Sequence, residues 1–122
     1  MSITNNALLF AASVRCVEVV GVAATQATAT KLTNQFSRVI KSVGSGAFIL
    51  PAIQSGEATE PMTLINDTGA SVNLFPAVGE KTNGTLNGAV AIAAGAFAYF
   101  VPVLNSPQNY PSTLDWRGNV IT

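Results

Sequence analysis

Short apolar runs separated by polar turns fill much of this 122-residue chain and limit the folds open to it. Runs at 47–50, 62–65 and 96–103 contain Val, Ile, Leu or aromatic residues, and Gly, Pro, Asn or Asp lie close to their ends. Gly, Pro, Asn and Asp are the residues that turns require. Short runs at regular spacing are typical of β-strands. We therefore expect an all-β protein, built as a compact β-sandwich or jelly-roll-like domain.

The chain is short enough to form a single domain, and no long linker divides it. We assign residues 25–104 to the β core and residues 1–24 to an N-terminal arm or strand. Residues 105–122 are expected to form a C-terminal tail, an arm with one or two short strands.

Turn-forming residues predict how some of these strands connect. Asp67-Thr68-Gly69-Ala70 separates the runs 62–66 and 71–75 and has the length of a hairpin turn. Within 71–75, apolar and polar residues alternate, which predicts one buried and one exposed face. Asn83-Gly84 is a second strong turn signal.

The segment Leu32–Val43 fits two structures. Its apolar residues recur at the spacing of one helix face, and Gly44 follows where a helix cap would stand. Residues 38–43 also fit a strand that ends at the Gly44-Ser45-Gly46 turn. The residues alone leave helix and strand open.

Charge and residue type exclude several functions. The chain has six basic and six acidic residues, a net charge of zero, no His and one Cys. A surface that follows phosphates needs clustered Lys and Arg, so we expect no nucleic-acid partner. Cys16 alone forms neither an intrachain disulfide nor a zinc site, and a Ser-His-Asp triad is excluded without His. We expect no cofactor, no metal and no enzymatic activity.

Apolar residues make up 48% of the chain and charged residues only 10%, so much apolar surface needs a cover. A membrane is a poor candidate. The uncharged run 88–104 contains Gly and Pro and is shorter than the roughly 20 residues of a spanning helix. Other protein chains are the better cover.

Asp67-Thr68-Gly69 is also the motif of aspartic proteases, in which two carboxylates share a proton across a two-fold axis. A chain of this size could supply one carboxylate to a homodimer. Asn66, however, stands where those proteases have an apolar residue. A turn rich in turn-forming residues is the simpler interpretation, and the homodimeric protease stays as a minor alternative.

Aromatic side chains mark candidate contact sites. Phe97 and Tyr99 should share one face of their strand, with Ala98 and Phe100 on the other. A strand with aromatics on both faces needs cover on both, so we predict a subunit interface at Phe97, Tyr99 and Phe100. Tyr110 and Trp116 lie in the tail, where they either anchor a partner or fold back onto their own domain.

A series of short, turn-centred segments lies between residues 24 and 100. The segments are 25–28, 46–51, 64–70, 74–79, Asn83-Gly84 and 92–95. This pattern resembles small virion structural proteins of tailed bacteriophages, the capsid decoration (cement) proteins. The chain departs from that pattern at Thr82, where Ile is usual, and in its longer C-terminal tail.

The resemblance implies a protein on the outer surface of a virion capsid that clamps neighbouring major capsid proteins. Such proteins are homo-oligomers, with trimers favoured and dimers possible. The resemblance also favours a strand over a helix at Leu32–Val43. The residues that we expect to contact the capsid are Leu8, Leu9, Phe10, Tyr110 and Trp116. A tail fibre, spike or host-binding module is the alternative function.

Overall fold

The computed structural model describes residues 16–44, 46–54, 60–103 and 114–122 of the chain. Within these ranges it is nearly all β-structure, which confirms the all-β prediction, and the one helical element is the 3-10 turn η1 (Gln26–Thr28). The strands are β1 (Cys16–Ala23), β2 (Thr30–Lys31), β3 (Phe36–Ser42), β4 (Gly46–Ile49), β5 (Met62–Asn66), β6 (Val72–Phe75), β7 (Lys81–Thr82), β8 (Thr85–Leu86), β9 (Val90–Ile92), β10 (Phe97–Val103) and β11 (Asp115–Ile121).

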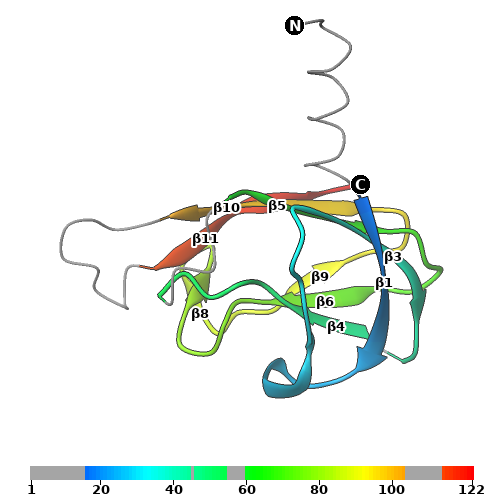
Figure 1. Cartoon of the computed structure of the whole chain (residues 1–122), viewed down its shortest axis with the longest axis horizontal. Helices are drawn as coiled ribbons and strands as arrows, with labels where there is room; N and C mark the ends of the chain where they lie inside the picture. Colours follow the sequence, from blue (N-terminus) through cyan, green and yellow to red (C-terminus); the bar gives the residue numbers. More distant parts are fainter. Residues whose placement is uncertain (1–15, 45, 55–59, 104–113) are drawn as a thin grey trace, which may run out of the picture.

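The strands form one curled, mixed sheet in the order β8-β7-β11-β10-β5-β3-β1-β4-β6-β9, with β2 beside β4. Strand β1 connects its two halves, because it pairs with β3 over Cys16–Gly21 and with β4 at Val22 and Ala23. Figure 1 shows β10, β5 and β11 lying across from β4, β6 and β9. The two halves therefore share hydrogen bonds through β1, and the sandwich form of the prediction is not confirmed.

From β3 to β6, successive strands alternate between the two halves of the sheet. Strands β3 and β5 pair in parallel in one half, and β4 and β6 pair in parallel in the other. The predicted hairpin between 62–66 and 71–75 is therefore wrong, since β5 pairs with β3 and β10 while β6 pairs with β4 and β9. The turn-forming residues at 67–70 instead form an arch that carries the chain from one half to the other.

Three local predictions are resolved by the strands. The ambiguous segment 32–43 contains strand β3, so of its two interpretations the strand is correct and the helix is wrong. In β6, Val72 and Leu74 are buried and Asn73 is half-buried, as their alternation predicts. Asn83 and Gly84 form the turn of the β7–β8 hairpin with φ of 47° and 83°, the left-handed conformation that a tight hairpin turn needs.

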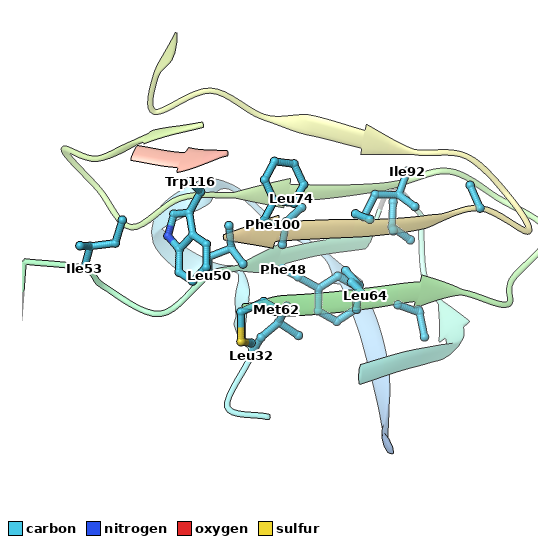
Figure 2. Packing of buried hydrophobic residues seen from close by; sticks show 14 of the residues in the cluster. Leu32, Phe48, Leu50, Ile53, Met62, Leu64, Leu74, Ile92, Phe100 and Trp116 are labelled. Carbon is cyan, nitrogen blue, oxygen red and sulfur yellow. The ribbon is translucent and has the colours of Figure 1, made fainter. Parts of the chain in front are cut away.

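The hydrophobic core lies between the two halves of the sheet (Figure 2). Its largest fully buried side chains include Phe48 from β4, Phe100 from β10 and Trp116 from β11. Strand β11 pairs with β10 over seven residues, from Asp115 to Ile121. The prediction of a C-terminal arm is therefore wrong for residues 115–121, because full-length pairing and a buried Trp116 make them part of the core.

A buried asparagine fixes the arch after β5. The Asn66 side chain is fully buried, and its Nδ2 lies 2.8 Å from the carbonyl oxygen of Ala70, 2.9 Å from that of Ile92 and 3.1 Å from that of Ala93. Its Oδ1 accepts hydrogen bonds from the backbone N–H and the hydroxyl of Thr68. Asn66 thus connects the β5–β6 arch to the β9–β10 connection, and every buried polar atom of its amide has a partner.

A second buried polar residue holds the segment after β4. Glu80 is 2% exposed, and its two carboxylate oxygens accept the backbone N–H groups of Ile53 at 2.9 Å and Gln54 at 2.8 Å. These charge-assisted hydrogen bonds compensate part of the cost of burying a carboxylate.

Candidate interaction surface

Strand β10 has an apolar side chain on both of its faces. Ala98 and Phe100 are buried in the core, whereas Phe97 is 37% exposed, Tyr99 44% and Val101 38%. The predicted alternation is therefore confirmed. The second set of side chains is apolar and faces away from the core.

The register of neighbouring strands extends this apolar surface sideways. Residues that are paired across strands put their side chains on the same face of the sheet. Phe97 is paired with Ile65 on β5 and with Ile121 on β11, and Tyr99 is paired with Thr63, which is paired with Phe36 on β3. We call this surface the outer face; its apolar members are Phe36, Ile65, Phe97, Tyr99, Val101 and Ile121.

The outer face leaves substantial apolar area in water. Ile121 is 49% exposed, and Val103 at the end of β10 is 40% exposed. Single apolar side chains at a surface are ordinary, but a contiguous group across several strands marks a site of contact with another molecule.

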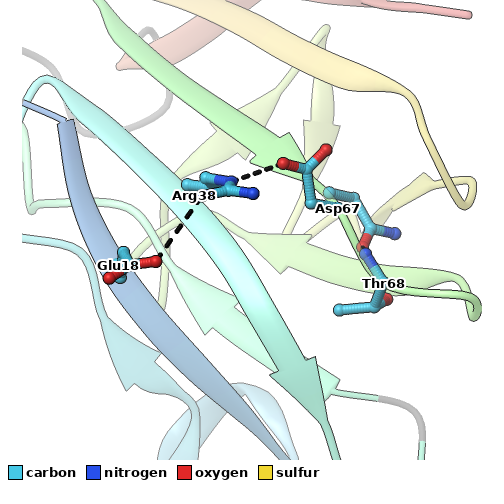
Figure 3. Close-up of polar contacts among 5 residues, drawn as sticks. Glu18, Arg38, Asp67 and Thr68 are labelled. Carbon is cyan, nitrogen blue, oxygen red and sulfur yellow. Dashed lines mark hydrogen bonds and ion pairs between the residues drawn. The ribbon is translucent and has the colours of Figure 1, made fainter.

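A charged cluster borders the β1 side of the outer face (Figure 3). Arg38 on β3 forms an ion pair through Nε with Asp67, and its guanidinium also lies 3.5 Å from the Glu18 carboxylate on β1. These side chains are about half exposed. The exposed Lys41 on β3 is paired with Val20 on β1, so two acidic and two basic residues leave this border without net charge.

The opposite border, on β11 and β7, is also charged. Arg117 on β11 forms an ion pair with Asp115 at 2.7 Å, and Lys81 on β7 is paired with Asp115 in the sheet. Asp115 is 4% exposed and also accepts the backbone N–H of Gly84 at 3.0 Å. Two basic residues and one acidic residue give a net charge of +1.

The structure separates the residues predicted for subunit contact. Phe97 and Tyr99 lie on the outer face, where they are accessible to a partner. Phe100 is 1% exposed and packs in the core of its own chain, so its assignment to the interface is wrong. Sequence reasoning missed Ile65, Phe36 and Ile121, because pairing between distant strands brings them beside Phe97 and Tyr99.

The predicted capsid-contact residues divide in the same way. Trp116 is fully buried, so of the two interpretations of this residue, folding back onto its own domain is correct and the surface anchor is wrong. Leu8, Leu9, Phe10 and Tyr110 lie outside the described residues.

Asp67, the residue of the protease-like motif, lies at the border of the outer face. Its carboxylate pairs with Arg38, and the neighbouring Asn66 and Thr68 hydrogen-bond to each other and to the arch. The observed role of the motif is thus to form the arch after β5. Among the described residues, no group of three His, Cys, Asp or Glu side chains is placed to hold a metal ion.

No helix among the described residues has the length and apolar character needed to cross a membrane. No family model, no curated protein and no solved structure matches the chain.

Proposed function

We propose that this chain is a non-enzymatic virion structural protein that binds other protein subunits and decorates a bacteriophage capsid. Its partners in this proposal are the major capsid protein and further copies of itself, and its place is the outer surface of the capsid. The choice of a virus particle rests on the resemblance of the turn-centred segments to capsid decoration proteins.

The observation that carries the proposal is an apolar outer face on a domain whose core is already closed. Phe100, Trp116 and Phe48 fill the interior, so Phe97, Tyr99 and Ile121 are not needed to complete it. Leaving such side chains in water costs roughly 25 cal/mol for each Å² of apolar surface. A binding partner would remove that cost, which favours a function in assembly.

Clamping by several weak contacts suits a decoration protein. Each contact contributes modestly, and linked subunits raise the effective concentration of the remaining ones. Charged residues at both borders of the outer face add specificity and orientation to such a contact.

The proposal is tested with particles that lack the protein. Purified protein is added at increasing concentration, and bound copies and the temperature of particle disruption are measured. Saturable binding to the capsid lattice with an increased disruption temperature supports the proposal, and no binding to capsids overturns it.

A parallel binding measurement with host cell envelopes addresses the alternative function. Binding to envelopes without binding to capsids would support a tail fibre, spike or host-binding module. A Tyr99→Glu variant, which places a charge on the outer face, should weaken capsid or subunit contact, whereas Val78→Glu on an exposed loop should not.

A further inference from the structure

We propose that Asn83 is a site of spontaneous deamidation that the folded chain keeps unreactive, and that its reaction marks the release of the β7–β8 hairpin from β11. Hydrogen bonds between the Asn83-Gly84 turn and β11 carry the proposal. It goes beyond the proposed function and does not rest on it.

An asparagine followed by glycine is chemically labile, because glycine has no Cβ to hinder its backbone nitrogen. That nitrogen loses its proton to the solvent and attacks Cγ of the asparagine. A five-membered succinimide forms as the Cγ–Nδ2 bond breaks, and Nδ2 takes up a proton and leaves as ammonia. Water then opens the ring at either carbonyl to give aspartate or isoaspartate. The chain has two such pairs, Asn83-Gly84 and Asn87-Gly88.

The first pair lies where the sheet is most easily opened. Asn83 and Gly84 are exposed and form the turn between β7 and β8, and β8 stands at the end of the strand order. Strand β7 pairs with β11 at Lys81 and Thr82. Short elements at an edge open more readily than core strands, so solvent would reach Asn83 often unless its reacting atoms are held.

Strand β11 holds each of these atoms. The attacking nitrogen, the backbone N of Gly84, donates its hydrogen to the Asp115 carboxylate, with Oδ2 at 3.0 Å and Oδ1 at 3.2 Å. The leaving group, Nδ2 of Asn83, donates to the carbonyl oxygen of Gly118 at 2.9 Å, and Oδ1 of Asn83 accepts the backbone N–H of Gly118 at 3.1 Å. While the hairpin is docked, nucleophile and amide are therefore fixed on two different residues of β11.

The bond to Asp115 should protect most. Asp115 is 4% exposed and forms an ion pair with Arg117, so its carboxylate is fixed in place. Hydrogen bonds to a charged acceptor are roughly twice as strong as those between neutral groups. The carboxylate also opposes loss of the Gly84 proton, because the nitrogen anion would face a second negative charge.

Deamidation at position 83 would keep the hairpin from docking again. A carboxylate there has no N–H to donate, so an oxygen would face the carbonyl oxygen of Gly118. Asn87 differs, because its Oδ1 accepts the backbone N–H of Gly79 at 2.7 Å and Nε2 of Gln26 at 3.1 Å. A carboxylate at position 87 keeps both acceptor contacts. The same chemical change should therefore release the hairpin at position 83 and be tolerated at position 87.

The first test measures deamidation at both positions of the full-length chain. The chain is kept at mildly alkaline pH in buffer or in concentrated urea, and peptide mapping by mass spectrometry quantifies aspartate and isoaspartate at positions 83 and 87. In urea the two positions should react at similar rates. In buffer Asn83 should react about 100-fold or more slowly than in urea, because its hydrogen bonds must first open.

Asp115→Ala should increase the rate at Asn83 in buffer by about 10-fold or more, because the attacking nitrogen loses its charged acceptor. The rate at Asn87 should stay unchanged. Glu60→Ala, which removes an exposed carboxylate, is the control. Circular dichroism confirms that each variant is folded, and if Asp115→Ala is not, the ratio between buffer and urea in the unmodified chain decides.

The second test uses the product. Asn83→Asp should increase hydrogen exchange at the backbone N–H groups of Lys81 and Asn83 by about 10-fold, because these groups donate to the carbonyl oxygens of Leu114 and Trp116 when the hairpin is docked. Asn87→Asp is the matched control and should leave this exchange unchanged.

The proposal is overturned if Asn83 reacts equally fast in buffer and in urea, or if a folded Asp115→Ala variant leaves its rate unchanged or accelerates both positions equally. Equal exchange in Asn83→Asp and Asn87→Asp would also overturn it. Binding to capsids is measured separately, so failure of either proposal leaves the other standing.

Discussion

The two faces of strand β10 have similar side chains and different surroundings. Ala98 and Phe100 point into the core and are almost completely buried, whereas Phe97 and Tyr99 point outward and are more than one third exposed. The inner side chains meet those of the opposite half of the same sheet, in a core that includes Phe48 and Leu74. Among the described residues, the outer ones are paired with residues of their own face on β5 and β11.

This difference separates folding from assembly. Apolar side chains on the inner face stabilise the folded chain, because folding itself removes them from water. Folding removes the apolar side chains of the outer face from water only in part, so they contribute little to the stability of the folded chain. A bound partner would remove more of their surface from water. Four experiments test this distinction, from the largest expected effect to the smallest.

The inner face should dominate the free energy of unfolding. Phe100→Ala should lower it by about 3–5 kcal/mol, because it removes a large buried ring and leaves a cavity. Tyr99→Ala, one residue away on the outer face, should change it by less than about 1 kcal/mol in the monomeric chain. Urea denaturation at low protein concentration measures both, and equal losses would refute the distinction between the two faces.

The buried amide of Asn66 should contribute almost as much to the free energy of unfolding as an apolar core residue does. Asn66→Ala should lower the free energy of unfolding by about 2–4 kcal/mol, because it removes the buried hydrogen bond to the carbonyl of Ile92 and the further bonds that connect the two chain segments. Asn119→Ala, an exposed amide on the outer face, is the control and should change little. Thermal unfolding followed by circular dichroism compares the two, and a loss below about 0.5 kcal/mol for Asn66→Ala would contradict its anchoring role.

Glu80→Ala should destabilise the chain by about 1–3 kcal/mol, because the backbone N–H groups of Ile53 and Gln54 lose their acceptors. Glu80→Gln keeps one acceptor oxygen and should recover part of the loss. The exposed Glu60→Ala is the matched control. If Glu80→Ala and Glu60→Ala unfold at the same urea concentration, the hydrogen bonds of Glu80 contribute nothing to stability.

The charges at the border of the outer face should have the smallest effect on folding. Arg38→Ala removes ion pairs with Glu18 and Asp67 whose side chains are about half exposed, and such pairs contribute about 0–1 kcal/mol. The difference from the unmodified chain should shrink further at high salt. A loss of several kcal/mol would mean that this border is part of the folding core, and would remove the case for an assembly surface.

Much of the local structure was predictable from short-range pattern. The alternation in 71–75 gives the buried and exposed faces of β6, and Asn83-Gly84 gives the β7–β8 hairpin, because both depend on residues next to each other. The arch at 67–70 was misread as a hairpin, since hairpins and arches use the same turn-forming residues. Only the pairing of β5 with β3 and β10 distinguishes them.

The candidate site was predictable only in part. Phe97 and Tyr99 were recognisable because they alternate along a single strand with the core residues Ala98 and Phe100. Ile65, Phe36 and Ile121 were not, because the pairs that connect them to Phe97 and Tyr99 across β3, β5, β10 and β11 join positions 24 to 36 residues apart in the sequence. Trp116 was assigned equally to a partner and to the core, since nothing local shows that β11 pairs with the whole of β10.

The sequence by itself determined that the chain is all-β, where most of its strands and turns lie, and which side chains share a face within one strand. These properties depend on the period of two residues and on the backbone preferences of Gly, Asn and Pro. The tertiary structure alone decided which strands are neighbours, and therefore that Phe100 and Trp116 fill the core while Phe97 and Tyr99 remain at the surface. Pairing between distant strands is settled by how the whole set of apolar faces can be buried at once, which no single segment of the chain contains.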